Sequence, residues 1–199
     1  ADELQAAGLS CAIFLIDEEK ANLIPAHFGY PRKALEKAET MIGITLEDFS
    51  MKIESVGLFS KVVQEQETVF VEDLEEVIKD FLPAPLKPLA GKLVETLKIP
   101  CSIDAPLIVE DEILGTLSVQ GEQLSAADIP TITAFAHQIA ASWRKARLLE
   151  QAQHQIAIRE QAEEETQRRV QQLTTINKMG QSVLSNLDVE KALSEVVEA

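Results

Sequence analysis

The chain has 199 residues and a mass of 21.9 kDa, with 33 acidic and 18 basic side chains and a formal charge of −15. Apolar residues make up 46% of it, which is typical of chains that bury a core and excludes disorder for the chain as a whole. Residues 1–143 hold 24 acidic and only 10 basic groups. Such an acidic surface repels phosphate backbones, so no nucleic-acid partner is expected.

The two cysteines, Cys11 and Cys101, and three scattered histidines form neither a disulfide framework nor a four-ligand zinc site. We therefore expect no metal and a reducing, cytoplasmic setting. No apolar stretch reaches the roughly 20 residues that a membrane helix needs, and no signal peptide is recognisable, so no membrane contact is expected for this fragment. Because the sequence begins at Ala1 rather than at methionine, we expect a piece of a longer protein.

In the first hundred residues, short apolar runs alternate with charged or proline-containing breaks, a pattern typical of mixed strands and helices. The predicted strands are Leu9–Asp17, Asn22–Gly29, Phe49–Ile53 and Thr68–Val71, and the predicted helices are Arg32–Met41, Val56–Gln64 and, within a proline-rich excursion, a segment around Ala90–Leu97. Glu72 and Asp73 are expected to end the fourth strand in a turn.

A β-hairpin is the clearest prediction for the residues that follow. Ile103, Ala105, Leu107 and Val109 would share one face of its first strand, and Ile113, Gly115, Leu117 and Val119 one face of the second, with Glu110–Glu112 as the turn. Pro106 has no N–H to donate, so it demands an edge position or a bulge. Strands and helices in this irregular order predict an α+β domain with an antiparallel sheet flanked by helices.

Everything after Ser125 favours one long helix. Ser125 and Asp128 form a capping-box pattern, and apolar residues from Ile129 to Trp143 recur at steps of three and four, which predicts a stripe that packs on the sheet. No glycine or proline lies between Pro130 and Gly180, and a helix of that length must leave the domain.

Beyond Trp143 the apolar spacing becomes that of heptads, which predicts a parallel coiled coil and hence a homodimer. The predicted interface residues are Leu149, Ile156, Val170, Leu173 and Ile176. The seam is polar in the middle, around residues 159–166, and its phase shifts after Leu173, as in a stutter or stammer. Asn186–Asp188 then predicts a break before a last short helix at Val189–Val197.

Four segments in order resemble the GAF domain, a small-molecule-sensing relative of PAS domains. CAIFLID is similar to the family's first strand, VGLFSKVVQEQETVFVEDL to its helix–strand stretch, IDAPLIVEDEILGTLSV to its closing hairpin, and LSAADIPTITAFAHQIAASWRKARLLEQ to its final helix. The resemblance covers residues 1–150. It implies a GAF-like, PAS-related fold and a regulatory, non-enzymatic role for this fragment.

Residues 173–199 resemble the first helix of a second GAF domain. The resemblance divides the chain into a GAF domain (1–148), a coiled-coil signalling helix (149–185) and the start of a second GAF domain (186–199). It implies a signalling parent with tandem sensor domains, such as a sensor histidine kinase of a two-component system or a diguanylate cyclase.

The resemblance also directs the search for a ligand. Cyclic-nucleotide-binding members carry an Asn-Lys pair and a Phe at positions that are occupied here by Gln120–Glu122 and Leu124. Bilin-binding members attach the chromophore through a cysteine that precedes a histidine, and neither cysteine here does so. We therefore expect neither of these ligands, nor any other cofactor. Phe70, Phe81 and Cys101 flank the segment that covers the family's pocket, which makes them candidate ligand-binding residues, or ordinary core. The alternatives are a ligand-free dimerisation scaffold and a small redox enzyme using Cys11 and Cys101.

Overall fold

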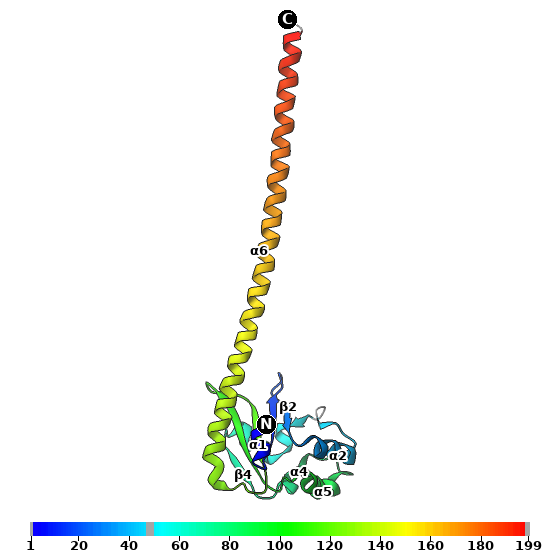
Figure 1. Cartoon of the computed structure of the whole chain (residues 1–199), viewed down its shortest axis with the longest axis vertical. Helices are drawn as coiled ribbons and strands as arrows, with labels where there is room; N and C mark the ends of the chain where they lie inside the picture. The colour runs from blue at the N-terminus through cyan, green and yellow to red at the C-terminus, as the bar shows by residue number, and fades with distance from the viewer. Residues whose placement is uncertain (1, 47–49, 198–199) are drawn as a thin grey trace. The chain divides into compact units, whose positions relative to one another are not determined.

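The computed structural model describes residues 2–46 and 50–197, with side chains for residues 4–46 and 50–182. It divides into two compact units, Ala1–Lys145 and Ala146–Ala199, which are described separately (Figure 1). The first unit holds a sheet with helices on both faces, which confirms the predicted α+β class.

The sheet has six antiparallel strands in the order β3-β2-β1-β6-β5-β4. They are β1 (Ser10–Ile16), β2 (Asn22–Gly29), β3 (Met51–Lys52), β4 (Val69–Val71), β5 (Ser102–Val109) and β6 (Glu112–Gln120). The predicted strands are all present. The third is shorter than expected, and Phe49, which opened the prediction, lies outside the described residues.

One face of the sheet is covered by the start of α6 (Ile129–Val197). Ile132, Ala136 and Ala140, spaced by one helical turn, pack there on buried apolar side chains that include Ile103 and Leu117. The predicted capping box precedes this helix, in the short helix η4 (Ala126–Asp128), where the Ser125 N–H donates to Asp128 Oδ2 at 2.9 Å. The predicted stripe is therefore confirmed for Ile132, Ala136 and Ala140, with Ile129 and Ile139 partly buried beside them. Phe135 and Trp143, which the same spacing assigns to the stripe, remain 38% and 36% exposed.

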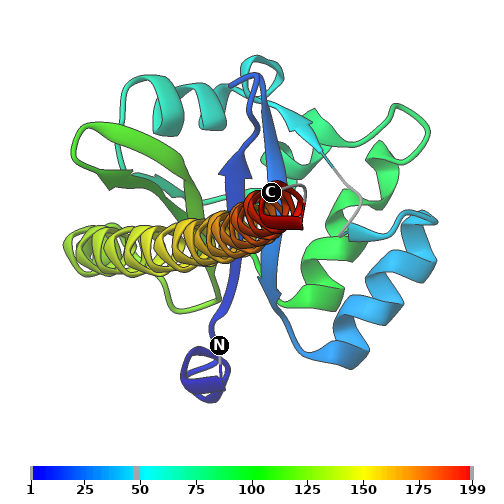
Figure 2. The same cartoon turned by 90° about the horizontal axis from the view of Figure 1, so that it is seen from above.

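The opposite face carries the remaining helices of the domain. These are α2 (Arg32–Ile42), η2 (Ile53–Ser55), α3 (Gly57–Gln64), α4 (Leu74–Phe81), η3 (Lys87–Leu89) and α5 (Ala90–Leu97), while the short α1 (Asp2–Ala6) precedes β1. The helix α5 lies beside both α2 and α4 (Figures 1 and 2). Their facing residues form a buried apolar cluster around Ala38, Ile78 and Leu93.

The helix α4 was not predicted from the sequence, because Glu72 and Asp73 were assigned to a turn and the residues just after them were assigned to no element. Asp73 is in fact the N-cap of this helix, where its Oδ1 accepts the Glu75 N–H at 3.0 Å. The acidic first turn, Glu75 and Glu76, complements the helix dipole. A charged cluster that looked like a strand end is therefore also a helix start.

The β5–β6 hairpin matches its prediction closely, although the turn consists of Glu110 and Asp111 alone, both with positive φ. Since β4 pairs only with residues 102–104 of β5, Pro106 lies beyond its end, where β5 has become an edge. On β6, a Cβ at Gly115 would collide with the carbonyl oxygen of Phe14, so this close approach of β1 and β6 requires glycine.

The helix α6 continues without interruption to Val197, so the predicted break at Asn186–Asp188 is wrong. Asn and Asp cost a helix interior only about 0.7 kcal/mol each relative to alanine, and no proline follows them to force a stop. Within the described residues, no helix combines the length and the apolar character that a membrane span requires.

Candidate functional site

A cavity of about 100 Å³ lies between the sheet and the helices α2 to α5, on the face opposite α6. Apolar side chains make up most of its wall. They are Phe14, Phe28, Tyr30, Ala38, Ile42, Leu46, Met51, Leu58, Phe59, Leu74, Val77, Ile78, Phe81, Leu82, Leu93, Leu97 and Ile99. The wall is built by the strands β1, β2 and β3 together with the helices α2 to α5. Such convergence of several elements on one apolar space is usual for a small-molecule pocket.

Aromatic rings form one side of this cavity. The Phe28 ring stacks on Tyr30 with centroids 5.9 Å apart, and Phe14 meets Phe28 edge-on at 5.8 Å. Phe59 of α3 lies 6.2 Å from Phe14 at a tilted angle. These mutual contacts stabilise the rings against one another and make this side of the cavity apolar.

Three polar side chains, Asp104, Ser118 and Gln120, complete the cavity from the sheet. They come from the central strands β5 and β6, where Asp104 is the cross-strand partner of Ser118. All three are buried, and Asp104 is only 2% exposed. Because side chains alternate between the faces of a strand, these residues lie on the side opposite Ile103, Leu117 and Val119.

The polar groups form a chain of hydrogen bonds that ends at Asp104. The Tyr30 hydroxyl donates to Gln120 Oε1 at 2.6 Å, and Gln120 Nε2 donates to Ser118 Oγ at 2.9 Å. Ser118 in turn donates to the Asp104 carboxylate, which also accepts the Ser102 hydroxyl at 2.6 Å. The hydrogen bonds of this chain therefore all run toward the carboxylate.

Burial dominates the electrostatics of the site. Removal from water raises the pKa of Asp104 to about 6, against the opposing effect of the Ser102 and Ser118 hydrogen bonds. Burial likewise raises the pKa of Tyr30, so that its hydroxyl stays protonated and acts as a donor. Among the described residues that line the cavity there is no lysine, arginine or histidine to pair with Asp104.

The structure separates the three candidate ligand-binding residues. Phe81, at the end of α4, lines the cavity. Phe70 lies opposite Ile103 on the neighbouring strand and packs in the cluster beneath α6. Cys101 is buried just before β5, where its Sγ donates to the carbonyl oxygen of Gly121 at 2.8 Å. Only Phe81 is thus placed where a molecule in the cavity would touch it.

The thiols have no setting for nucleophilic chemistry. Cys11 and Cys101 are both buried, and burial raises the pKa of each. A raised pKa leaves little thiolate, which is the reactive form. Over the described residues, no three His, Cys, Asp or Glu side chains come together as a metal site would need.

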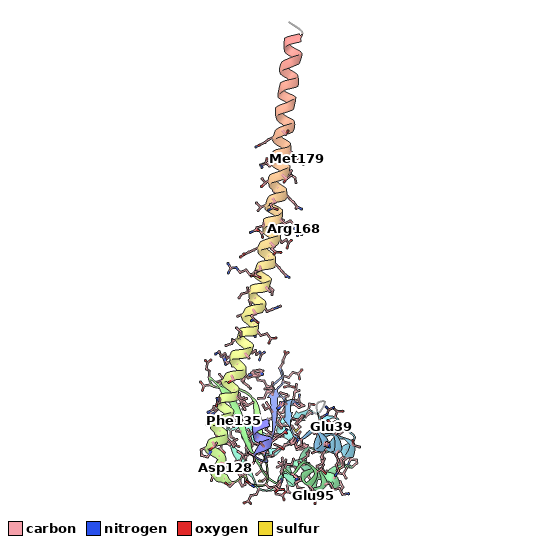
Figure 3. The ribbon with its side chains drawn as sticks, viewed as in Figure 1. Glu39, Glu95, Asp128, Phe135, Arg168 and Met179 are labelled. Atoms are coloured by element: carbon pink, nitrogen blue, oxygen red, sulfur yellow. The ribbon has the colours of Figure 1, made fainter. Side chains whose placement is uncertain are left out.

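The predicted interface residues all lie exposed along the second unit. Leu149, Ile156, Val170, Leu173 and Ile176 are between 56% and 66% exposed in the single chain. Between them the helix surface is charged, with i,i+4 ion pairs such as Arg159–Glu163. Figure 3 shows side chains projecting all around this helix, with Arg168 and Met179 labelled.

Sequence reasoning missed Tyr30, Asp104, Ser118 and Gln120 as site residues. The alternation in β5 and β6 puts Asp104 and Ser118 on a common face, but only the apolar face of the hairpin was considered in the sequence. Several predicted helices favour a sheet that is covered on both faces, but the sequence does not say that α2 to α5 cover this one.

Comparison with known proteins relates the first unit to other signalling domains. Residues 3–143 match the family model of the GAF domain. No curated protein matches the sequence. Among solved structures, a methyl-accepting chemotaxis protein (its residues 122 to 287) aligns with a TM-score of 0.52 and 18% identity, over 73% of this chain and 84% of that one. The GAF domain/HD domain protein from Geobacter sulfurreducens aligns with a TM-score of 0.50 and 16% identity, over 70% and 82%.

Proposed function

Because the chain belongs to the GAF family, whose members are regulatory and typically non-catalytic modules, we propose that it senses a small molecule in the cavity and passes the signal on through α6. One observation carries the proposal, namely an apolar cavity with a few convergent polar groups inside the domain. A ligand-free scaffold would have no reason to keep a buried, unpaired carboxylate such as Asp104, because burying a charge destabilises the fold.

The strands β5 and β6 offer a route from the cavity to the helix. They present Asp104 and Ser118 to the cavity and Ile103 and Leu117 to α6 on the reverse side. At the hairpin tip, Arg144 of α6 forms ion pairs with Glu110 at 3.0 Å and Glu112 at 3.4 Å. A ligand that shifts these two strands would therefore move the helix that leaves the domain.

A parallel homodimer would receive this movement. The heptad spacing and exposure of Leu149, Ile156 and Val170 support it, since a lone helix would leave those side chains in water. The polar stretch near Glu163 weakens the seam in its middle, which would let the two helices change register or rotation.

The wider setting we propose is a cytoplasmic signalling protein. In it, residues 1–148 are the sensor, 149–185 the coiled-coil connector and 186–199 the start of a second GAF domain, with a histidine kinase or a diguanylate cyclase as output. The proposal is supported by the family and by the sequence resemblance of residues 173–199. Of the two fold-level neighbours, the GAF domain/HD domain protein has a second domain by its name, and the chemotaxis protein is represented by its residues 122 to 287.

Native mass spectrometry of the purified chain tests both the binding of a small molecule and the formation of a dimer. We expect a dimer of twice 21.9 kDa, with an added small mass when ligand is retained. A bare dimer that takes up no molecule from a fragment library would favour the scaffold, and a monomer at all concentrations would contradict the coiled coil.

A matched pair of variants places the interface on the heptad face. Ile156→Asn should weaken the dimer at least tenfold, because Ile156 lies in the predicted seam. Ile158→Asn should leave the dimer intact, because Ile158 is similarly exposed but lies about 200° around the helix. Equal effects of the two substitutions would contradict this interface.

A further inference from the structure

The polar end of the cavity indicates which chemistry it accepts. Resting on the proposed function, we infer that the ligand is a small organic ammonium ion, whose charged nitrogen pairs with Asp104 while its apolar body contacts the aromatic wall. Three features of the site support this: the unpaired carboxylate, the direction of the hydrogen bonds, and the charge of the domain.

The unpaired carboxylate is the first feature. Asp104 is 2% exposed, and no basic side chain lines the cavity among the described residues. Buried charges in proteins are normally paired or bound to a metal, because an unpaired one is costly. Asp104 has two serine hydroxyls as donors and still has lone pairs free, since a carboxylate offers about four acceptor sites.

The direction of the hydrogen bonds is the second feature. Tyr30 donates to Gln120, Gln120 to Ser118, and Ser118 to Asp104, so these hydrogen bonds all run in one direction, toward the carboxylate. That arrangement favours the ionised form of Asp104 and opposes its desolvation. Apart from the second N–H of Gln120, this chain has no donor left for a ligand acceptor, whereas a ligand donor finds a charged acceptor in Asp104.

The charge of the domain is the third feature. Residues 1–143 carry 24 acidic groups against 10 basic ones. A field of this sign concentrates cations near the surface and repels anions. A carboxylate or phosphate ligand would therefore be repelled by the domain and then again by Asp104.

The cavity volume limits the size of the molecule. At about 100 Å³ it is smaller than the apolar cavity of about 150 Å³ that holds benzene in another protein. A compact amine with a branched alkyl body fits this description. Isobutylammonium is a suitable probe, and isobutanol is its neutral match in size and shape.

Calorimetric titration of the full chain with these two probes tests the inference. We expect isobutylammonium to bind at least tenfold more tightly than isobutanol, and Asp104→Asn to remove that difference. The control Asp111→Asn, which removes a carboxylate of the same hairpin that faces water, should keep it. Amide shifts in residues 102–105 and 118–120 would locate the bound amine.

The outcomes separate this inference from the proposed function. If isobutanol binds as well as the amine, the cavity accepts small molecules but the ammonium inference is wrong. If the amine binds Asp104→Asn as tightly as the unaltered chain, Asp104 is not its partner and the inference is again wrong. If neither probe nor any larger amine or alcohol binds, the sensory proposal itself fails. The comparison of two probes on the unaltered chain needs no variant to fold.

Discussion

Beneath α6, the central strands present Cys11, Ile103 and Leu117, and the helix fills the space above them with Ile132, Ala136 and Ala140. On the other side, the same strands present Asp104, Ser118 and Gln120 to a space that α2 to α5 leave partly empty. The first face thus gains stability from close packing, whereas the second gives up part of that gain to bury polar groups beside a cavity. The polar face therefore costs stability, and the use that we propose for it is the binding of a small molecule.

Leucine truncation should distinguish the two faces most strongly. Leu117→Ala should lower the free energy of unfolding by about 4 kcal/mol, because Leu117 is fully buried among well-packed neighbours. Leu93→Ala, on the cavity wall, should cost about 2 kcal/mol, since its side chain already borders empty space. Guanidinium unfolding at one protein concentration measures both. Equal losses would mean that the cavity face is packed as tightly as the helix face.

The buried carboxylate should make stability depend on pH. The pKa of Asp104 is about 6 in the folded chain and about 3.9 when unfolded, so between these values the folded state binds more protons. Stability therefore falls as pH rises from about 4 to about 6, by about 3 kcal/mol in total, and this loss persists above pH 6. The chain is therefore spared this loss of stability in full only below the unfolded pKa of Asp104, at about 3.9.

The difference between Asp104→Asn and the unaltered chain isolates that loss. The variant should lack it and be the more stable of the two at pH 8, while Asp111→Asn, at the hairpin tip, should follow the unaltered chain. Other carboxylates titrate equally in all three proteins and cancel. A pH profile of Asp104→Asn that matches the unaltered chain would show that Asp104 is not desolvated.

The two faces also explain what the sequence could and could not predict. The helix face could be predicted, because its apolar residues alternate along β5 and β6 and recur every three or four residues in α6. The cavity face could not, because its strand positions have the polar alternation of a water-facing surface. That stripe is buried only because α2 to α5 cover it in the tertiary structure. One of these helices, α4, was itself not predicted, because its N-cap Asp73 was assigned to a turn.

The same limit applies to the individual candidates. The resemblance made Phe81 and Phe70 equal candidates for cavity lining or ordinary core. Phe81 lines the cavity, whereas the strand position of Phe70 faces α6. Near Asn186, low helix propensity predicted a break, but the helix continues there. A preference of this size is too weak to end a long helix. Local patterns thus predict the elements well, whereas the site depends on which faces the elements cover.

Deleting single hydroxyls from the polar face should have smaller effects of opposite sign. Tyr30→Phe leaves the buried Gln120 Oε1 without its donor and should cost about 1–2 kcal/mol. Thr116→Val should be neutral or stabilising by about 1 kcal/mol, because the buried Thr116 hydroxyl has no partner among the described residues. Thermal unfolding of both variants gives the comparison. Stabilisation by Tyr30→Phe would mean that the hydrogen-bond chain does not support the fold.

The smallest effect on stability is expected where the hairpin meets the helix. Arg144→Ala should cost less than about 1 kcal/mol, since the side chains of Glu110 and Glu112 are 76% and 60% exposed and water screens both ion pairs.

The effect of Arg144→Ala on coupling between the cavity and α6 should be larger, because Arg144 joins α6 to the tip of the strands that line the cavity. Hydrogen exchange of residues 146–182, with and without isobutylammonium, measures that coupling. We expect the probe to alter exchange in the unaltered chain and in Lys145→Ala, whose side chain is exposed, but not in Arg144→Ala. An unchanged response in Arg144→Ala would place the route through the packed face beneath α6 instead of through the hairpin tip.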